Sequence, residues 1–216
     1  MNAHLELLLS RVYDGALSAT HHADLQKSGL SPATIAAQFI RSVPPTMIAR
    51  LLGYDLPKVT SALLFPYASA RGGFMDAVRL KLFPPQVDAA GHAFKYAQPK
   101  GSAPRVYFIR HCLREVLDGD APLWVVEGEK KSLAVAQLGL PAIGIAGVEG
   151  WHIRGSRALL PDFDAIRLGG RIVEVLPDAD YETNPNVRRA VERLGTALAA
   201  CGAHPRLVML PSELPR

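Results

Sequence analysis

Cysteine is scarce in this chain, and its scarcity limits the kinds of site that the chain can build. Cys112 and Cys201 are the only two cysteines among 216 residues, and no Cys-x-x-Cys motif occurs. A disulfide scaffold needs several paired cysteines, and a zinc ribbon needs clustered ones. Both are excluded, so any metal in this protein is expected to be held by oxygen atoms.

Long apolar runs are also missing from the sequence. No window approaches the roughly 18 uninterrupted apolar residues that a membrane-spanning helix requires. The leucine-rich stretch at residues 5–9 has neither the length nor the basic flank of a signal peptide. We therefore expect a cytoplasmic protein that has no membrane partner.

Charge is low overall but unevenly distributed. Hydrophobic residues make up 49% of the chain and charged residues 20%, a composition that excludes a disordered protein. The net charge is +4, yet residues 1–110 carry 12 basic and 6 acidic side chains, whereas residues 111–216 carry 12 and 14. The excess is greatest in a basic segment that suits polyphosphate, although a solvated basic sheet face explains it equally well. Its cations are Arg71, Arg79, Lys81, Lys95, Lys100, Arg105 and Arg110.

The pattern of predicted elements changes along the chain. Short helices are expected at residues 31–40 and 46–52, followed by an antiparallel meander with strands at 62–65, 77–83 and 93–96. From residue 123 onward strands and helices alternate, which predicts a parallel sheet with crossover helices. These strands are expected at 123–126, 142–145, 171–176 and 206–210, and the helices at 129–138 and 185–201. The change predicts two domains, a helical and antiparallel basic domain over residues 1–115 and an α/β domain over residues 116–216.

Carboxylates follow two of the predicted parallel strands. Glu127 ends the strand at 123–126, and Asp178 and Asp180 follow the strand at 171–176. Functional groups of parallel α/β sheets gather at the carboxyl ends of the strands, so we expect the three carboxylates to converge on one edge. Like charges crowd together unfavourably unless a cation neutralises them, and an oxygen-only site suits Mg²⁺. Each motif alone also fits a helix cap or a polar turn, but together they predict a metal site.

These segments resemble a known family. Trp124-Val-Val-Glu-Gly-Glu-Lys-Lys131, Ala142-Ile-Gly-Ile-Ala-Gly147 and the segment from Asp178 to Pro185 look like the TOPRIM domain of bacterial primases, topoisomerases and some nucleases. The closer similarity is to the TOPRIM-like primase domains of phage and plasmid primase-helicase proteins. In the first half, residues 29–35 and 94–102 resemble the opening helix and the basic strand and loop of primase catalytic cores. The resemblance implies a Rossmann-like parallel sheet with flanking helices, preceded by a small helical and antiparallel-β domain.

The resemblance also assigns roles to individual residues. It implies that Glu127, Asp178 and Asp180 are the catalytic residues and the ligands of Mg²⁺ or Mn²⁺. It matches Lys95, Lys100 and Arg105 to basic positions that contact nucleotide phosphates or template. The basic strand adds Arg79 and Lys81 as candidates, and a predicted helix start adds Lys130 and Lys131. Cations at a helix start oppose the helix dipole and favour an anionic partner, although a plain surface position explains these two lysines equally well.

The activity that follows from this resemblance is that of a metal-dependent DNA primase. Such a nucleotidyltransferase would synthesise short RNA primers on a single-stranded DNA template from nucleoside triphosphates, with a replicative helicase as a further partner and no zinc. Two alternatives stay open. The same carboxylates can activate water against a phosphodiester, as in a TOPRIM nuclease. The chain can also be a non-catalytic nucleic-acid-binding module of a mobile element.

Overall fold

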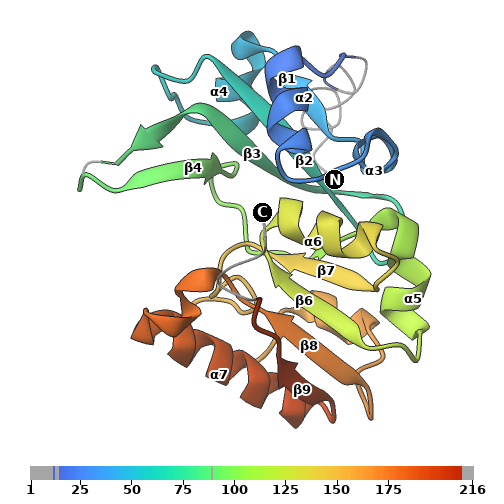
Figure 1. Cartoon of the computed structure of the whole chain (residues 1–216). Helices are drawn as coiled ribbons and strands as arrows, with labels where there is room; N and C mark the ends of the chain where they lie inside the picture. The colour runs from blue at the N-terminus through green and yellow to red at the C-terminus, as the bar shows by residue number, and fades with distance from the viewer. Residues whose placement is uncertain (1–11, 13–14, 89, 211–216) are drawn as a thin grey trace. The chain divides into compact units, whose positions relative to one another are not determined.

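The computed structural model describes residue 12 and residues 15–88 and 90–210 (Figure 1). It divides into two compact units, Met1–Ser102 and Ala103–Arg216, here called the first and second units. The division falls earlier in the chain than the predicted boundary near residue 115. Residues 103–115 therefore belong to the second unit, and residues 107 and 108 pair with a strand of its sheet. Among the described helices, none combines the length and the apolar composition that a bilayer-spanning segment needs.

The first unit is built on an antiparallel sheet with short helices. Strand β2 pairs with β1 and β3, and β3 pairs with β4, all antiparallel, as the predicted meander requires. Neither α2 nor β1 was predicted, because their short segments carry weak periodicity. The elements are α2 (Ala19–Gln26), α3 (Pro32–Ala37), β1 (Arg41–Val43), α4 (Pro45–Leu52), β2 (Ser61–Ala68), β3 (Phe74–Val87) and β4 (Ala93–Ala97).

Strand β3 separates the core of the first unit from its basic face. Val78, Leu80 and Leu82 are buried and pack in one hydrophobic cluster with the apolar face of α4. Because side chains alternate along a strand, Arg79 and Lys81 lie on the opposite face. Lys81 nevertheless has a partner there, since its Nζ lies 2.5 Å from Oδ1 of Asp24 in α2.

The second unit is a mostly parallel α/β sheet with flanking helices. Its strand order is β5-β7-β6-β8-β9, in which β5 is antiparallel to β7 and the other pairs are parallel. Helix α6 packs on β6 and β7, and α7 packs on β8 and β9 (Figure 1). The predicted alternation of strand and helix is confirmed. The elements are β5 (Tyr107–Phe108), η1 (Arg110–Cys112), α5 (Leu113–Asp118), β6 (Leu123–Glu127), α6 (Glu129–Gln137), β7 (Ala142–Ile145), η2 (Pro161–Ala165), β8 (Ile172–Leu176), η3 (Ala179–Glu182), α7 (Pro185–Ala200) and β9 (His204–Leu207).

Strands β9 and β5 differ from the predicted elements, and strand pairing explains both differences. The last strand begins at His204, opposite Ile172, and not at residue 206, because it pairs with β8 from its first residue. The two-residue strand β5 is too short to carry a periodic signal, but it pairs with β7 and brings the chain before α5 into this sheet.

Arg171, directly before β8, ties α5 to the second unit. Its side chain is only 5% exposed, and burial lowers its pKa. The guanidinium donates hydrogen bonds to the carbonyl oxygens of Glu115 (2.7 Å), Val116 (2.5 Å) and Ala121 (2.9 Å). Carbonyls in the last turn of a helix lack a full set of partners within the helix. Arg171 supplies the donor to the Val116 carbonyl and a second donor to the Glu115 carbonyl, which also accepts from the backbone N–H of Gly119 at 3.1 Å. This anchoring explains why the boundary between the units precedes α5.

Candidate active site

The strand pairing places Glu127 and Asp178 at the same edge of the second unit's sheet. Strands β6 and β8 are parallel neighbours, with Val126 opposite Leu176. Glu127 is the last residue of β6, and Asp178 lies two residues beyond the end of β8. Gly128 turns the chain from β6 into α6 with a φ of 88°, a conformation that other residues rarely adopt.

Lys131 lies among the three predicted carboxylates. Its ammonium forms an ion pair with Asp178, and both side chains are about half exposed. Burial lowers the pKa of Lys131, whereas the negative charges of Glu127 and Asp180 act in the opposite direction and raise it. All three carboxylates therefore act on one ammonium group. Its positive charge reduces the repulsion among them. From the sequence alone, we expect a metal ion to provide this positive charge.

Backbone geometry explains how the lysine reaches this edge. Lys131 belongs to the first turn of α6, immediately after the turn at Gly128. A Cβ atom added at Gly128 would lie 3.6 Å from Cε of Lys131, so the lysine side chain passes directly over the glycine. The position of this lysine at a helix start predicts an anionic partner. The structure gives it one from within the chain, in Asp178.

The fit of a divalent cation to this edge can be judged from the donors. In the part of the chain that the structure describes, no three His, Cys, Asp or Glu side chains are arranged to hold a metal ion. The available donors are carboxylate oxygens, which are the ligands that Mg²⁺ and Mn²⁺ accept. The chemistry of these donors therefore fits such an ion, and the ion would have to displace Lys131 from its ion pair with Asp178.

The predicted phosphate-binding cations fall into two groups. Lys95 and Lys100 are exposed in the first unit. Arg79, in contrast, has its guanidinium 4.6 Å from the centre of the Tyr96 ring, and Lys81 is paired with Asp24. Lys95 and Lys100 are thus the more accessible of the four.

The two predicted cations of the second unit outside the Lys131 ion pair are also partly engaged. Arg105 lies in the second unit, with Nη2 2.7 Å from Oδ1 of Asp162. Lys130 is half-buried in the first turn of α6. Neither therefore presents a fully exposed charge.

A charged cluster after β7 was not predicted from the sequence. Glu149 pairs with Arg193 of α7, and its Oε2 lies 2.9 Å from Nε2 of His152. In the sequence, this region stands out only through Gly147, which ends one of the motifs that resemble the TOPRIM family. Glu149 and Arg193 are 44 residues apart, so no local pattern links them.

Comparison with known proteins extends these observations. The model of a family described as a domain of unknown function, DUF3854, matches residues 113–215. No curated protein matches the chain. In the second unit, the family match thus covers the sheet edge that carries the three carboxylates.

Three solved structures are similar to nearly the whole chain. A DnaG catalytic core aligns with a TM-score of 0.62 and 20% identity over 99% of this chain and 74% of that one. The zinc-binding and RNA polymerase domains of the Aquifex aeolicus primase align with a TM-score of 0.65 and 14% identity, over 96% of this chain but 55% of that one. The RNA polymerase domain of Mycobacterium tuberculosis primase DnaG gives a TM-score of 0.54 and 13% identity, over 92% and 80%. The predicted fold class is confirmed: the chain has the α/β fold of a DnaG primase catalytic core.

Proposed function

We propose that this chain is the catalytic core of a cytoplasmic, primase-like nucleotidyltransferase that makes short RNA primers on single-stranded DNA. We further propose that it belongs with the primase-helicase proteins of phages and plasmids, so that a replicative helicase is its partner. The observation that supports the activity is the grouping of Glu127, Asp178 and Asp180 around Lys131 on a primase fold. The likeness to primases supports the fold, and the residues at this edge support the chemistry.

Glu127, Asp178 and Asp180 would hold Mg²⁺ or Mn²⁺. When bound, the metal would lower the pKa of an attacking 3′-hydroxyl and neutralise charge on the transferred phosphate. The oxygen of that hydroxyl forms a bond to the α-phosphorus of a nucleoside triphosphate, and pyrophosphate leaves as the bond from the α-phosphorus to its bridging oxygen breaks. The proton of the hydroxyl passes to water.

The lysines of this edge supply positive charge that the reaction can use. When Asp178 changes its partner, the ammonium of Lys131 becomes available to a phosphate oxygen of the incoming nucleotide. An ammonium is a compact charge on a flexible stem, so it can exchange one oxygen partner for another. Lys95 and Lys100, which are exposed, would hold the template or the triphosphate by charge attraction.

Turnover with defined substrates tests the proposal. The protein is incubated with single-stranded DNA, labelled nucleoside triphosphates and Mg²⁺ or Mn²⁺, and the products are separated by length. We expect new labelled RNA that Asp178→Asn abolishes and that Asp164→Asn, a change at an exposed carboxylate of η2, leaves intact. Shortened DNA would instead indicate a nuclease, and retention of DNA without turnover a binding module.

A further inference from the structure

A groove lies between the loop that follows β7 and helix α7 of the second unit. Three adjoining cavities make it up, with volumes of about 650, 720 and 410 Å³, and Arg193 lines all three. We call it the Arg193 groove. Because β7 is a parallel neighbour of β6, this loop leaves the same edge of the sheet as Glu127.

The 410 Å³ cavity is lined by hydrogen-bond donors and, among the described residues, by no carboxylate. Its polar lining comes from Arg157, Arg193, Ser156, Thr196 and His152, and Trp151 and alanines of α7 complete it. Arginine and hydroxyl groups are the usual ligands of phosphate oxygens, and arginine binds them with two N–H groups at once. A volume of this size lies within the range of small-molecule sites. The lining therefore suits an anionic group.

The indole of Trp151 forms a fixed wall of this cavity. The side chain is 2% exposed, and its Nε1 has no hydrogen-bond partner among the residues that the structure describes. Because this N–H has almost no accessible surface, Trp151 shapes the cavity by packing, with its ring 4.3 Å from the ring of His152. The residue is held firmly, since its carbonyl oxygen accepts a hydrogen bond from the backbone N–H of Leu160 at 2.9 Å.

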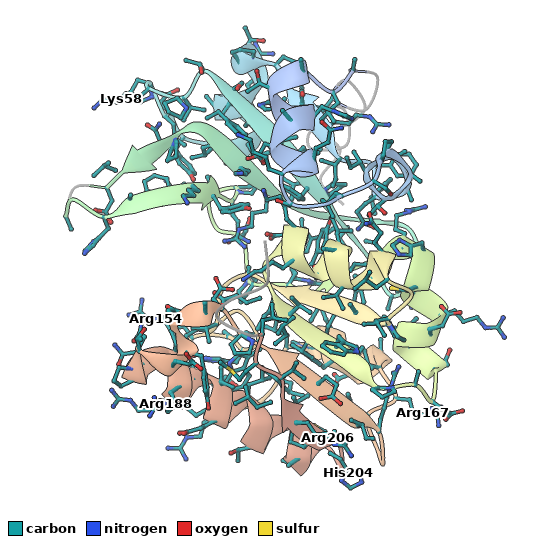
Figure 2. All side chains as sticks on the ribbon, viewed as in Figure 1. Lys58, Arg154, Arg167, Arg188, His204 and Arg206 are labelled. Atoms are coloured by element: carbon teal, nitrogen blue, oxygen red, sulfur yellow. The ribbon has the colours of Figure 1, made fainter. Side chains whose placement is uncertain are left out.

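The residues that line the groove carry a net positive charge. Four arginines and two glutamates line the three cavities together, a formal balance of +2. Glu149 holds Arg193 and His152 in place and is thereby engaged, so it does not neutralise Arg154 and Arg157 of the same loop. Figure 2 shows Arg154, which lines the groove, well apart from Arg206 in the second unit. The groove thus combines oriented donors with surplus positive charge.

We infer that the Arg193 groove is a phosphate-binding site, separate from the carboxylates at Glu127 and Asp178. Arg157 and Arg193 would donate to the phosphate oxygens. The phosphate can belong to a free nucleotide or to the backbone of a single nucleic-acid strand, and both sources present the same group. The inference does not depend on catalysis at Glu127, because binding here needs neither a metal nor turnover.

Binding measured in EDTA tests the inference and separates the two sources. Adenosine monophosphate, inorganic phosphate and a fluorescent twelve-nucleotide oligothymidylate are titrated into the wild type, Arg157→Gln and the control Arg206→Gln. Arg206 is an exposed cation of β9, 3.9 Å from Glu174. We expect Arg157→Gln to weaken binding at least about tenfold, because it removes a charge-assisted hydrogen bond, and Arg206→Gln to leave it unchanged.

Each outcome has a definite meaning. Comparably weaker binding of adenosine monophosphate and of the oligonucleotide identifies a nucleotide site, and weaker binding of the oligonucleotide alone identifies the strand backbone. In the second case the slope of log affinity against log salt concentration should fall by about 0.7, because one phosphate fewer is neutralised. Equal affinities for Arg157→Gln and Arg206→Gln would overturn the inference, and unchanged binding by Asp178→Asn keeps it distinct from the proposed activity.

Discussion

Replacing Lys131 with glutamine should make divalent cations bind more tightly while making the metal-free protein less stable. The substitution removes the ammonium that pairs with Asp178 and that Glu127 and Asp180 attract. Both side chains of the ion pair are about half exposed, so the pair contributes only about 0.2–1 kcal/mol. Loss of this competitor, together with the removal of a positive charge near the incoming ion, should raise Mg²⁺ affinity about fivefold.

The assay compares thermal unfolding of the wild type, Lys131→Gln and Lys130→Gln across a Mg²⁺ series. Lys130 is the adjacent lysine of the same helical turn, so its variant controls for the removal of charge near α6. In EDTA, Lys131→Gln should unfold at a lower temperature, because three carboxylates then repel one another without a resident cation. With Mg²⁺ it should gain more stability than the wild type, since binding to the folded state raises stability by mass action. The same Mg²⁺ response in both lysine variants would refute the idea that Lys131 occupies the cation position.

Three further changes probe the site and the fold. Asp178→Asn should lose most of the Mg²⁺-dependent rise in melting temperature and reduce any primer synthesis by several orders of magnitude, while its melting temperature in EDTA changes little. Arg171→Met removes the donor to the buried Val116 carbonyl of α5 and the charge-assisted hydrogen bonds to the carbonyls of Glu115 and Ala121, and should cost about 2–5 kcal/mol of unfolding free energy in urea denaturation, unlike Arg206→Met. His21 is buried against Ser42 and Ser61, and burial lowers its pKa from the ordinary value of 6.5. Its unfolded form therefore takes up a proton first as the pH falls, so stability should decline below about pH 6.5, by at most about 1.4 kcal/mol per pH unit, and His21→Gln should flatten that decline.

Much of the second unit could be predicted because its signals are local. The strand at residues 142–145 and the helix that begins at Pro185 lie where the patterns place them, since aliphatic runs and a capping Asn184 act within a few residues. Arg171 could not be predicted in the same way. Its hydrogen bonds reach carbonyls 50 to 56 residues earlier in the chain, and no pattern in the sequence indicates pairings of that separation.

The carboxylate edge shows that a sequence predicts where a residue lies along a strand better than it predicts which side chain will contact that residue. Parallel pairing of β6 with β8 brings Glu127 and Asp178 to one edge, and alternating strands and helices already predict parallel strands whose carboxyl ends share an edge. Which cation neutralises them depends instead on the turn at Gly128, because that turn lets the side chain of Lys131 pass back over the strand end. A lysine at this place supplies one positive charge where a divalent ion supplies two. The carboxylates therefore keep a net negative charge with Lys131 alone, and this remaining charge is what would attract a divalent cation to the edge.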